Sequence, residues 1–278
     1  MDKWVMAAML YVAVLIGGFT VYDQFWADGK QTAAAEMDHN EEPHADMNGS
    51  SSHEHGSDSQ HEGSSEVSAF VQADKDELKI FLKDKAGNPV DELAVNHEKL
   101  LHLIIVDETL QKYYHLHPEQ TGKGEFHIAN PLPAGFYKAF IDIKPKNLAY
   151  HAAPVPFVVG HPSAAANHQP LQPDTALIQQ VDGETVTLHM SSFQTNQPVT
   201  LSFDLDQTNL TPYLGAMGHV VILDEYAQNY LHVHPANDHE PVFETQFNQP
   251  GIYKIWAEFQ QNGKVRAFPF VVEIKGEN

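Results

Sequence analysis

The chain carries the same pattern twice, and this internal repeat constrains its fold more than any other feature. The segment HLIIVDETLQKYYHLHP at 102–118 aligns without gaps with HVVILDEYAQNYLHVHP at 219–235. Further along, AGFYKAFIDI at 134–143 matches PGIYKIWAEF at 250–259, and the tetrapeptide PFVV then follows in both copies. We therefore expect two homologous domains built on one plan.

Each copy is predicted to be an all-β domain. Short runs of Val, Ile, Leu, Phe and Tyr alternate with Gly, Pro and Asn, and no stretch keeps a helical period. A unit of about 95–105 residues has the size of an immunoglobulin-like β-sandwich. We expect two tandem sandwiches over 67–160 and 174–278, joined by a linker over 161–173. Their leading strands, within 77–90 and 184–199, are expected to be equivalent.

An uncharged segment near the N-terminus predicts a membrane helix. Residues 4–22, WVMAAMLYVAVLIGGFTVY, are long enough to span a hydrocarbon core of roughly 30 Å. A cleaved signal peptide is the alternative, but the small residues at 33–35 lie too far beyond the apolar run for a typical cleavage site. We expect an uncleaved anchor over 1–30. Lys3 is at the short end, so the positive-inside rule predicts a single-pass protein with an extracytoplasmic C-terminal part.

Residues 31–66 have the composition of a disordered tether. They contain no Lys or Arg and almost no large apolar side chains, so they cannot bury enough surface to offset the entropy of ordering. Five histidines, nine carboxylates and two methionines are interleaved there. These groups are ligands for zinc and copper, so weak metal capture and a purely solvated spacer are equal alternatives.

Composition limits the functions that remain. A formal net charge of -21 opposes nucleic-acid binding. The absence of Cys excludes disulfides, thiolate zinc sites, iron–sulfur clusters and blue-copper centres. Any metal site must therefore use the 18 histidines, methionine or carboxylates. The catalytic motifs G-x-S-x-G and G-x-x-x-x-G-K-[ST] are absent, so no reaction is predicted.

The repeated segment is predicted to bring three histidines of each domain together. A four-residue turn over 225–228 would pair His219 with His234 across an antiparallel hairpin. Opposed β-carbons in such a hairpin are about 4.5–5.5 Å apart, close enough for imidazoles to share an ion bound at about 2.0–2.1 Å. The predicted metal ligands are His219, His232 and His234 in the second domain, and His102, His115 and His117 in the first.

The second domain offers the better predicted site. Met217 precedes its first histidine, and His189 with Met190 lies on a neighbouring strand, so soft and nitrogen ligands favour copper, with zinc as the second possibility. The first domain has apolar Leu100 in place of the methionine but adds His97.

The histidines also have a purely structural interpretation. Both faces of the hairpin are apolar, so either could be buried, and the imidazoles could bond to backbone or to Asp107 and Asp224. Asp238 and His239 are either auxiliary ligands or part of a solvated loop.

The segments PYLGAMGHVVILDEYAQNYLHVHP at 212–235 and PGIYKIWAEFQQNGKVRAFPFVV at 250–272 carry a resemblance to a known group of proteins. They resemble a bacterial family of secreted or membrane-tethered β-domains with an HxHP motif that accompany copper and other heavy-metal handling systems. The resemblance covers most of the second domain and, more weakly, the first. It implies His219, His232 and His234 as ligands, with Met217 as a further one.

The sequence therefore predicts a membrane-anchored extracytoplasmic metal-binding protein that acts in sequestration, sensing or handover of copper or zinc. The alternative is an adhesion or assembly module that docks a membrane protein partner, such as a transporter or oxidase, and uses its histidines structurally.

Overall fold

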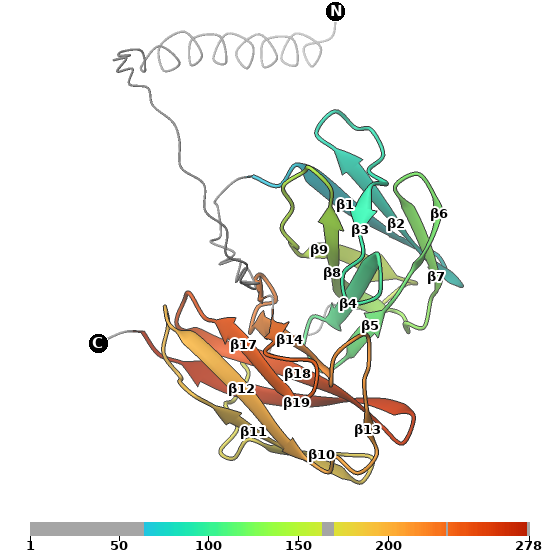
Figure 1. Ribbon diagram of the computed structural model, residues 1–278. Coiled ribbons are helices and arrows are strands. Elements are labelled where there is room, and N and C mark those ends of the chain that lie inside the picture. Colours follow the sequence, from blue (N-terminus) through green and yellow to red (C-terminus); the bar gives the residue numbers. More distant parts are fainter. Residues whose placement is uncertain (1–63, 163–169, 232, 277–278) are drawn as a thin grey trace, which may run out of the picture. The chain divides into compact units, whose positions relative to one another are not determined.

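The computed structural model describes residues 64–162, 170–231 and 233–276, which form two β-sandwiches within one compact unit (Figure 1). The expected anchor over 1–30, nearly all of the expected tether and His232 lie outside the described residues. In the described part of the chain, no helix is long and apolar enough to cross a bilayer. All the named elements of the described residues are strands, so the all-β prediction is confirmed for these residues.

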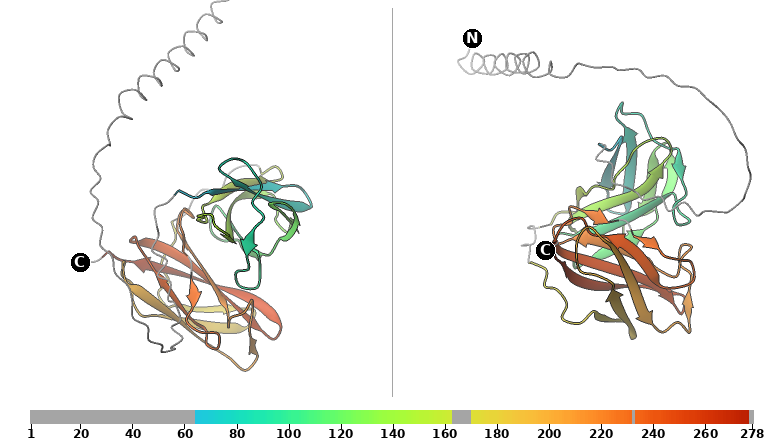
Figure 2. Two further views of the ribbon diagram at one scale, coloured as in Figure 1. Left: turned by 45° about the horizontal axis from the view of Figure 1, so that its top comes forward. Right: turned by 60° about the vertical axis from the view of Figure 1, so that its left-hand side comes forward.

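The first repeat consists of two antiparallel sheets, drawn in blue to yellow-green in Figures 1 and 2. One sheet has the order β1-β2-β7-β6, and the other has β3-β8-β4-β5 with β9 added on β8. This arrangement matches the ABED and CFG sheets of immunoglobulin-like domains. The strands are β1 (Val67–Ala73), β2 (Glu77–Asp84), β3 (Leu93–Ala94), β4 (Leu101–Asp107), β5 (Tyr113–Leu116), β6 (Glu119–Gly122), β7 (Glu125–Ala129), β8 (Gly135–Pro145) and β9 (Val155–Val159).

The second repeat has the same plan with one additional strand. Its sheets have the orders β10-β11-β12-β17-β16 and β13-β18-β14-β15, with β19 on β18. The strands are β10 (Ile178–Val181), β11 (Glu184–Met190), β12 (Pro198–Leu205), β13 (Leu210–Thr211), β14 (His219–Asp224), β15 (Tyr230–Leu231), β16 (His234–Pro235), β17 (Val242–Gln246), β18 (Gly251–Gln261) and β19 (Lys264–Ile274).

Strand pairing corrects the expected match between the leading strands. In β2, Ile80 pairs with Phe126, whereas in β12 Leu201 pairs with Phe243, the repeat equivalent of Phe126. Strand β2 therefore corresponds to β12, and the expected equivalence of β2 with β11 is wrong. In all three strands buried side chains alternate with half-buried or exposed ones, so alternation in the sequence could not distinguish them.

A tyrosine marks the same corner of each sandwich. The Tyr137 hydroxyl donates to the Pro133 carbonyl at 2.9 Å, and the Tyr253 hydroxyl donates to the Gln249 carbonyl at 2.8 Å. A bond from a tyrosine at the start of this strand to backbone just upstream is a hallmark of immunoglobulin-like domains. It supports the predicted fold in both repeats.

The outer faces of β4 and β14 are buried because the repeats pack against each other. Val220 and Ile222 belong to the core of the second sandwich, whereas Val221 and Leu223 join a separate cluster with side chains of the first repeat. The first repeat contributes Ile104, Val106, Leu110 and Phe140 to this interface cluster. This packing explains why both faces of each hairpin are apolar. The outer faces of the two sheets that contain β4 and β14 are buried between the repeats.

Equivalent residues make equivalent contacts across this interface. Lys138 Nζ donates to the Tyr226 carbonyl and, at 3.3 Å, to the Ala227 carbonyl. Its repeat equivalent Lys254 donates to the Leu110 carbonyl at 2.7 Å. Each lysine thus binds the turn of the opposite repeat, as in a two-fold symmetric dimer interface.

Candidate metal centre

Three histidines of the first repeat meet at the edge of the interface cluster. His102 lies on β4 and His115 on β5, while His117 follows the end of β5. The pairing of Ile104 with His115 and of Leu103 with Leu116 continues to His102 opposite His117, which is the register expected from the turn length. Each of the three histidines has one ring nitrogen within 4.8 Å of a ring nitrogen of the other two. We call these residues the histidine trio.

Hydrogen bonds fix where two of these rings carry their protons. His102 Nε2 lies 2.9 Å from the Asn96 carbonyl oxygen, and His115 Nδ1 lies 2.6 Å from a carboxylate oxygen of Glu258. A carbonyl and an ionised carboxylate only accept, so both ring nitrogens act as donors. The remaining nitrogens, His102 Nδ1 and His115 Nε2, face each other at 2.9 Å. In the neutral rings both carry lone pairs, which repel unless a cation or an additional proton lies between them.

The surroundings of His102 and His117 favour the neutral form of these two imidazoles. Burial lowers the pKa of His102, although its bond to the Asn96 carbonyl opposes this effect. Burial, together with repulsion from His115 and His102, lowers the pKa of His117 to about 3. His117 Nε2 is buried and has no hydrogen-bond partner. Neutral imidazole is the form that binds metal ions, so His102 and His117 are in the form suited to coordination at neutral pH.

The second repeat contributes a histidine and a carboxylate to the same place. His219 on β14 has its ring centroid 5.7 Å from that of His115 and 5.9 Å from that of His102. Its register partner on β18 is Glu258, the residue that holds His115. Burial and the neighbouring histidines lower the pKa of His219 to about 2. The Nε2 atom of His219 is also buried and without a partner.

The other predicted ligands of the second domain are placed differently. His219 pairs with Glu258 and His234 with Glu244, so the expected pairing of His219 with His234 is not formed among the described residues. The predicted register holds only for the two pairs of β15, after which the chain joins the other sheet as β16. His234 is exposed there, and His232 lies outside the described residues.

The expected soft ligands are also not at the trio. Met217 packs against the core of the second sandwich, as its repeat equivalent Leu100 does in the first. Met190 packs on the second core, and His189 is exposed on β11. His97 is half-buried, with its ring centroid 5.0 Å from that of His219.

The remaining polar residues predicted around the sites lie in turns and loops. Asp107 and Asp224 accept hydrogen bonds from backbone amides of their own turns. Asp238 and His239 are exposed.

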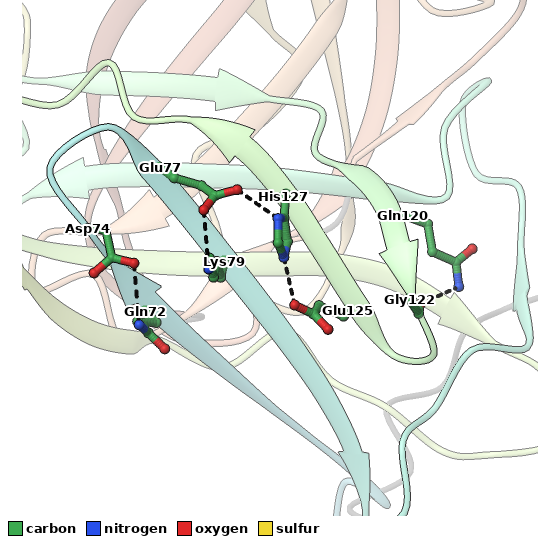
Figure 3. Close-up of polar contacts among 8 residues, drawn as sticks. All are labelled: Gln72, Asp74, Glu77, Lys79, Gln120, Gly122, Glu125 and His127. Atoms are coloured by element: carbon green, nitrogen blue, oxygen red, sulfur yellow. Dashed lines mark hydrogen bonds and ion pairs between the residues drawn. The ribbon is translucent and has the colours of Figure 1, made fainter.

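His127 of the first repeat is held differently from the histidines of the trio. His127 lies between two carboxylates, with Nδ1 2.7 Å from Glu77 and Nε2 2.7 Å from Glu125 (Figure 3). Both ring nitrogens face carboxylate acceptors, so these two contacts account for the site without a metal. In the trio, by contrast, His115 faces one carboxylate, that of Glu258, and His117 Nε2 has no hydrogen-bond partner.

The carboxylates next to the trio were missed in the sequence. Glu258 and its repeat equivalent Asp142 each occupy the strand position opposite a repeated histidine. Tyr230 donates to Asp142 at 3.1 Å, and burial together with the Glu258 carboxylate raises the pKa of Tyr113 well above its usual value. An acidic residue at the same position of both copies, within strands otherwise mostly apolar, was the available signal.

Comparison with known proteins identifies a family. The family described as a domain of unknown function (DUF8832) matches residues 59–160 and 179–276. No curated protein matches the chain.

Several solved structures are similar at low identity. The Escherichia coli adhesin FdeC is 14% identical, with 77% of this chain and 65% of that chain covered and a TM-score of 0.23. BcpA, the major pilin subunit of Bacillus cereus, is 9% identical over 67% of this chain and 68% of that one, with a TM-score of 0.19. The FN1–FN3 domains of chicken CNTN1 are 10% identical over 76% and 66%, with a TM-score of 0.21. The chain spans less than two thirds of the adhesin, and similarities this low carry no argument about function.

Proposed function

Since the chain belongs to the DUF8832 family, whose description states no activity, we propose its function from the site itself: it binds a transition-metal ion through the histidine trio. The observation that carries this proposal is the 2.9 Å contact between His102 Nδ1 and His115 Nε2. Each of these rings donates a proton on its other side, so two lone pairs converge when both rings are neutral. A bound cation turns this repulsion into two coordinate bonds.

A purely structural role fits these side chains less well. A structural histidine in a protein interior normally uses its ring nitrogens in hydrogen bonds. Here His117 Nε2 is buried without a partner, which costs about 1–3 kcal/mol when nothing compensates. Metal coordination would satisfy this atom together with the two facing lone pairs.

The supporting bonds resemble those around known metal ligands. Metal-binding histidines usually donate their second ring nitrogen to a carboxylate or backbone carbonyl, which fixes the ring and raises its basicity. Glu258 and the Asn96 carbonyl take these positions for His115 and His102.

The ligand set suits zinc and copper. Imidazole binds both ions, and a three-histidine site leaves a position open for a further ligand. The copper preference expected from Met217 loses its support, because that side chain packs against the second core. We therefore propose a zinc- or copper-binding protein without a reaction of its own.

The proposal includes a cellular setting that follows from the sequence. The apolar segment at 4–22 would anchor the chain, and residues 31–66 would hold the β-domains outside the cytoplasm and raise the local ion concentration. In this setting the trio would hold an ion for sequestration, sensing or handover to a membrane transporter or oxidase.

Calorimetric titration of the purified full chain with Zn(II) and Cu(II) tests this function. The variant His115→Ala/His117→Ala should lose one tight equivalent, while His189→Ala/His239→Ala, which changes two exposed histidines, should keep it. Both variants retain the histidines of residues 31–66, so weak binding there cancels in the comparison. Equal tight binding by the two variants would exclude the trio as the site.

Adhesion or assembly is the second candidate function. In it the β-domains dock a membrane protein partner and the histidines only stabilise the fold. The bonds of His102 to the Asn96 carbonyl and of His115 to Glu258 fit such a structural role. Absence of any tight metal equivalent in the titration would favour it.

A further inference from the structure

We infer that the metal centre is shared between the two repeats, with His219 as its fourth ligand and Glu258 as the positioning residue of His115. This inference rests on the proposed function, because it assigns additional residues to the same ion. The trio comes from the first repeat, whereas both additional residues come from the second.

The first support is the state of the His219 ring. Its Nε2 atom is buried and lacks a hydrogen-bond partner, as does His117 Nε2. Only three other buried side-chain polar atoms of the described residues share this state, and none of those belongs to a histidine. Two unsatisfied imidazole nitrogens in one cluster indicate that the cluster is built around a ligand that accepts lone pairs.

The second support is the spacing of the rings. Within the trio, the ring centroids are 4.7–5.2 Å apart. The ring centroid of His219 lies 5.7 Å from that of His115 and 5.9 Å from that of His102. Four imidazoles that bind one ion tetrahedrally through nitrogen at about 2.0–2.1 Å have centroids roughly 5 Å apart. The trio already has this spacing, and His219 needs to approach by less than about 1 Å on the same measure.

The third support is the connection through Glu258. This residue pairs with His219 between β14 and β18, and its carboxylate binds His115 across the interface at 2.6 Å. The side chains of His115 and Glu258 are only 3% and 6% exposed, so the charge of the carboxylate is poorly screened. One strand pair of the second repeat therefore positions a ligand of the first repeat and supplies a ligand of its own.

A shared centre would couple metal binding to the packing of the repeats. An ion held by β4 and β5 on one side and β14 on the other closes the interface next to the apolar cluster. Binding energy realised only when the repeats are packed stabilises that packing by mass action. The ion would thus hold the two sandwiches in their observed arrangement.

Cobalt(II) added to the full chain tests the inference, because its visible absorption depends on coordination number and ligand type. The wild-type chain should bind one tight equivalent with the intense bands of a four-coordinate centre. His219→Ala should still bind one equivalent through the trio, about tenfold or more weakly, with shifted bands because water replaces the imidazole. His189→Ala, which changes an exposed histidine on β11, should retain the wild-type spectrum.

The possible results distinguish a failure of the shared centre from a failure of the proposed function. Identical spectra and affinities for wild type and His219→Ala would overturn the shared centre while leaving the trio as a site. Cobalt binding that persists equally in His115→Ala/His117→Ala would overturn the proposed function itself. If His219→Ala fails to fold by circular dichroism, His219→Gln keeps a polar side chain of similar length and should show the same spectral shift.

Discussion

Replacing Glu258 by Gln isolates the role of one buried charge at the metal centre. The carboxylate lies 2.6 Å from His115 Nδ1, and both side chains are almost fully buried. An amide can still accept this hydrogen bond, but it loses the negative charge. Hydrogen bonds to charged groups contribute about 1.5–3 kcal/mol and neutral ones about 0.5–1.5 kcal/mol, so the exchange should cost about 1–2 kcal/mol.

A similar figure follows from the metal. Loss of the partner of a ligating histidine typically lowers metal affinity by about 10–100-fold, equivalent to about 1.4–2.7 kcal/mol. We therefore expect Glu258→Gln to weaken zinc binding by at least about tenfold, measured by competition with a chromophoric chelator.

The matched control is Glu125→Gln. It alters a carboxylate 2.7 Å from His127 Nε2, but the Glu125 side chain is 38% exposed and belongs to no metal site that we propose (Figure 3). Its effect on zinc binding should be negligible. If the two variants bound zinc with equal affinity, Glu258 would have no positioning role and the reasoning from its buried charge would be refuted.

Three further predictions concern stability. Gly218→Ala should destabilise the chain by about 1–3 kcal/mol in urea titrations, because its new β-carbon would lie 2.6 Å from the Phe259 ring and 2.7 Å from a β18 carbonyl. The control Gly276→Ala, which has open space around the new β-carbon, should leave the free energy of unfolding unchanged. Lys254→Met should cost about 1–3 kcal/mol, measured by thermal unfolding, because it removes a buried charged bond to a turn of the first repeat. The free energy of unfolding of the metal-free chain should decrease as the pH is lowered from 6.5 to 4. In this range the His219 pKa of about 2 keeps the ring neutral in the folded chain, whereas the ring in the unfolded chain binds a proton. The slope should be at most about 1.4 kcal/mol per pH unit for that ring, and an unchanged slope in His219→Ala would contradict this assignment.

The repeat made much of the fold predictable. Turn length and alternation gave the register of β4 and β5, because the six residues DETLQK can close the hairpin in few ways. That register places His102 opposite His117, so the trio could be found without a structure. The immunoglobulin-like sandwich was predicted from the length of the repeat and from its short apolar runs separated by Gly, Pro and Asn. It is confirmed in both copies.

Local sequence patterns could not predict the interface between the repeats. Glu258 and His115 are separated by 143 residues, and no spacing rule connects side chains that far apart in the chain. The expected second hairpin site also depended on β15 continuing as far as His234, whereas the chain leaves for the other sheet after Leu231. The apolar outer face of β14, with Val221 and Leu223, was the signal that this face packs against a partner.

X-ray absorption of zinc bound to the full chain at less than one equivalent tests the central claim most directly. We expect a first shell of nitrogen at about 2.0–2.1 Å with the outer-shell scattering of at least three imidazoles. The variant His115→Ala/His117→Ala should lose that imidazole signature. An unchanged imidazole shell in this variant, or a wild-type shell dominated by carboxylate oxygen, would show that the ion is held outside the trio.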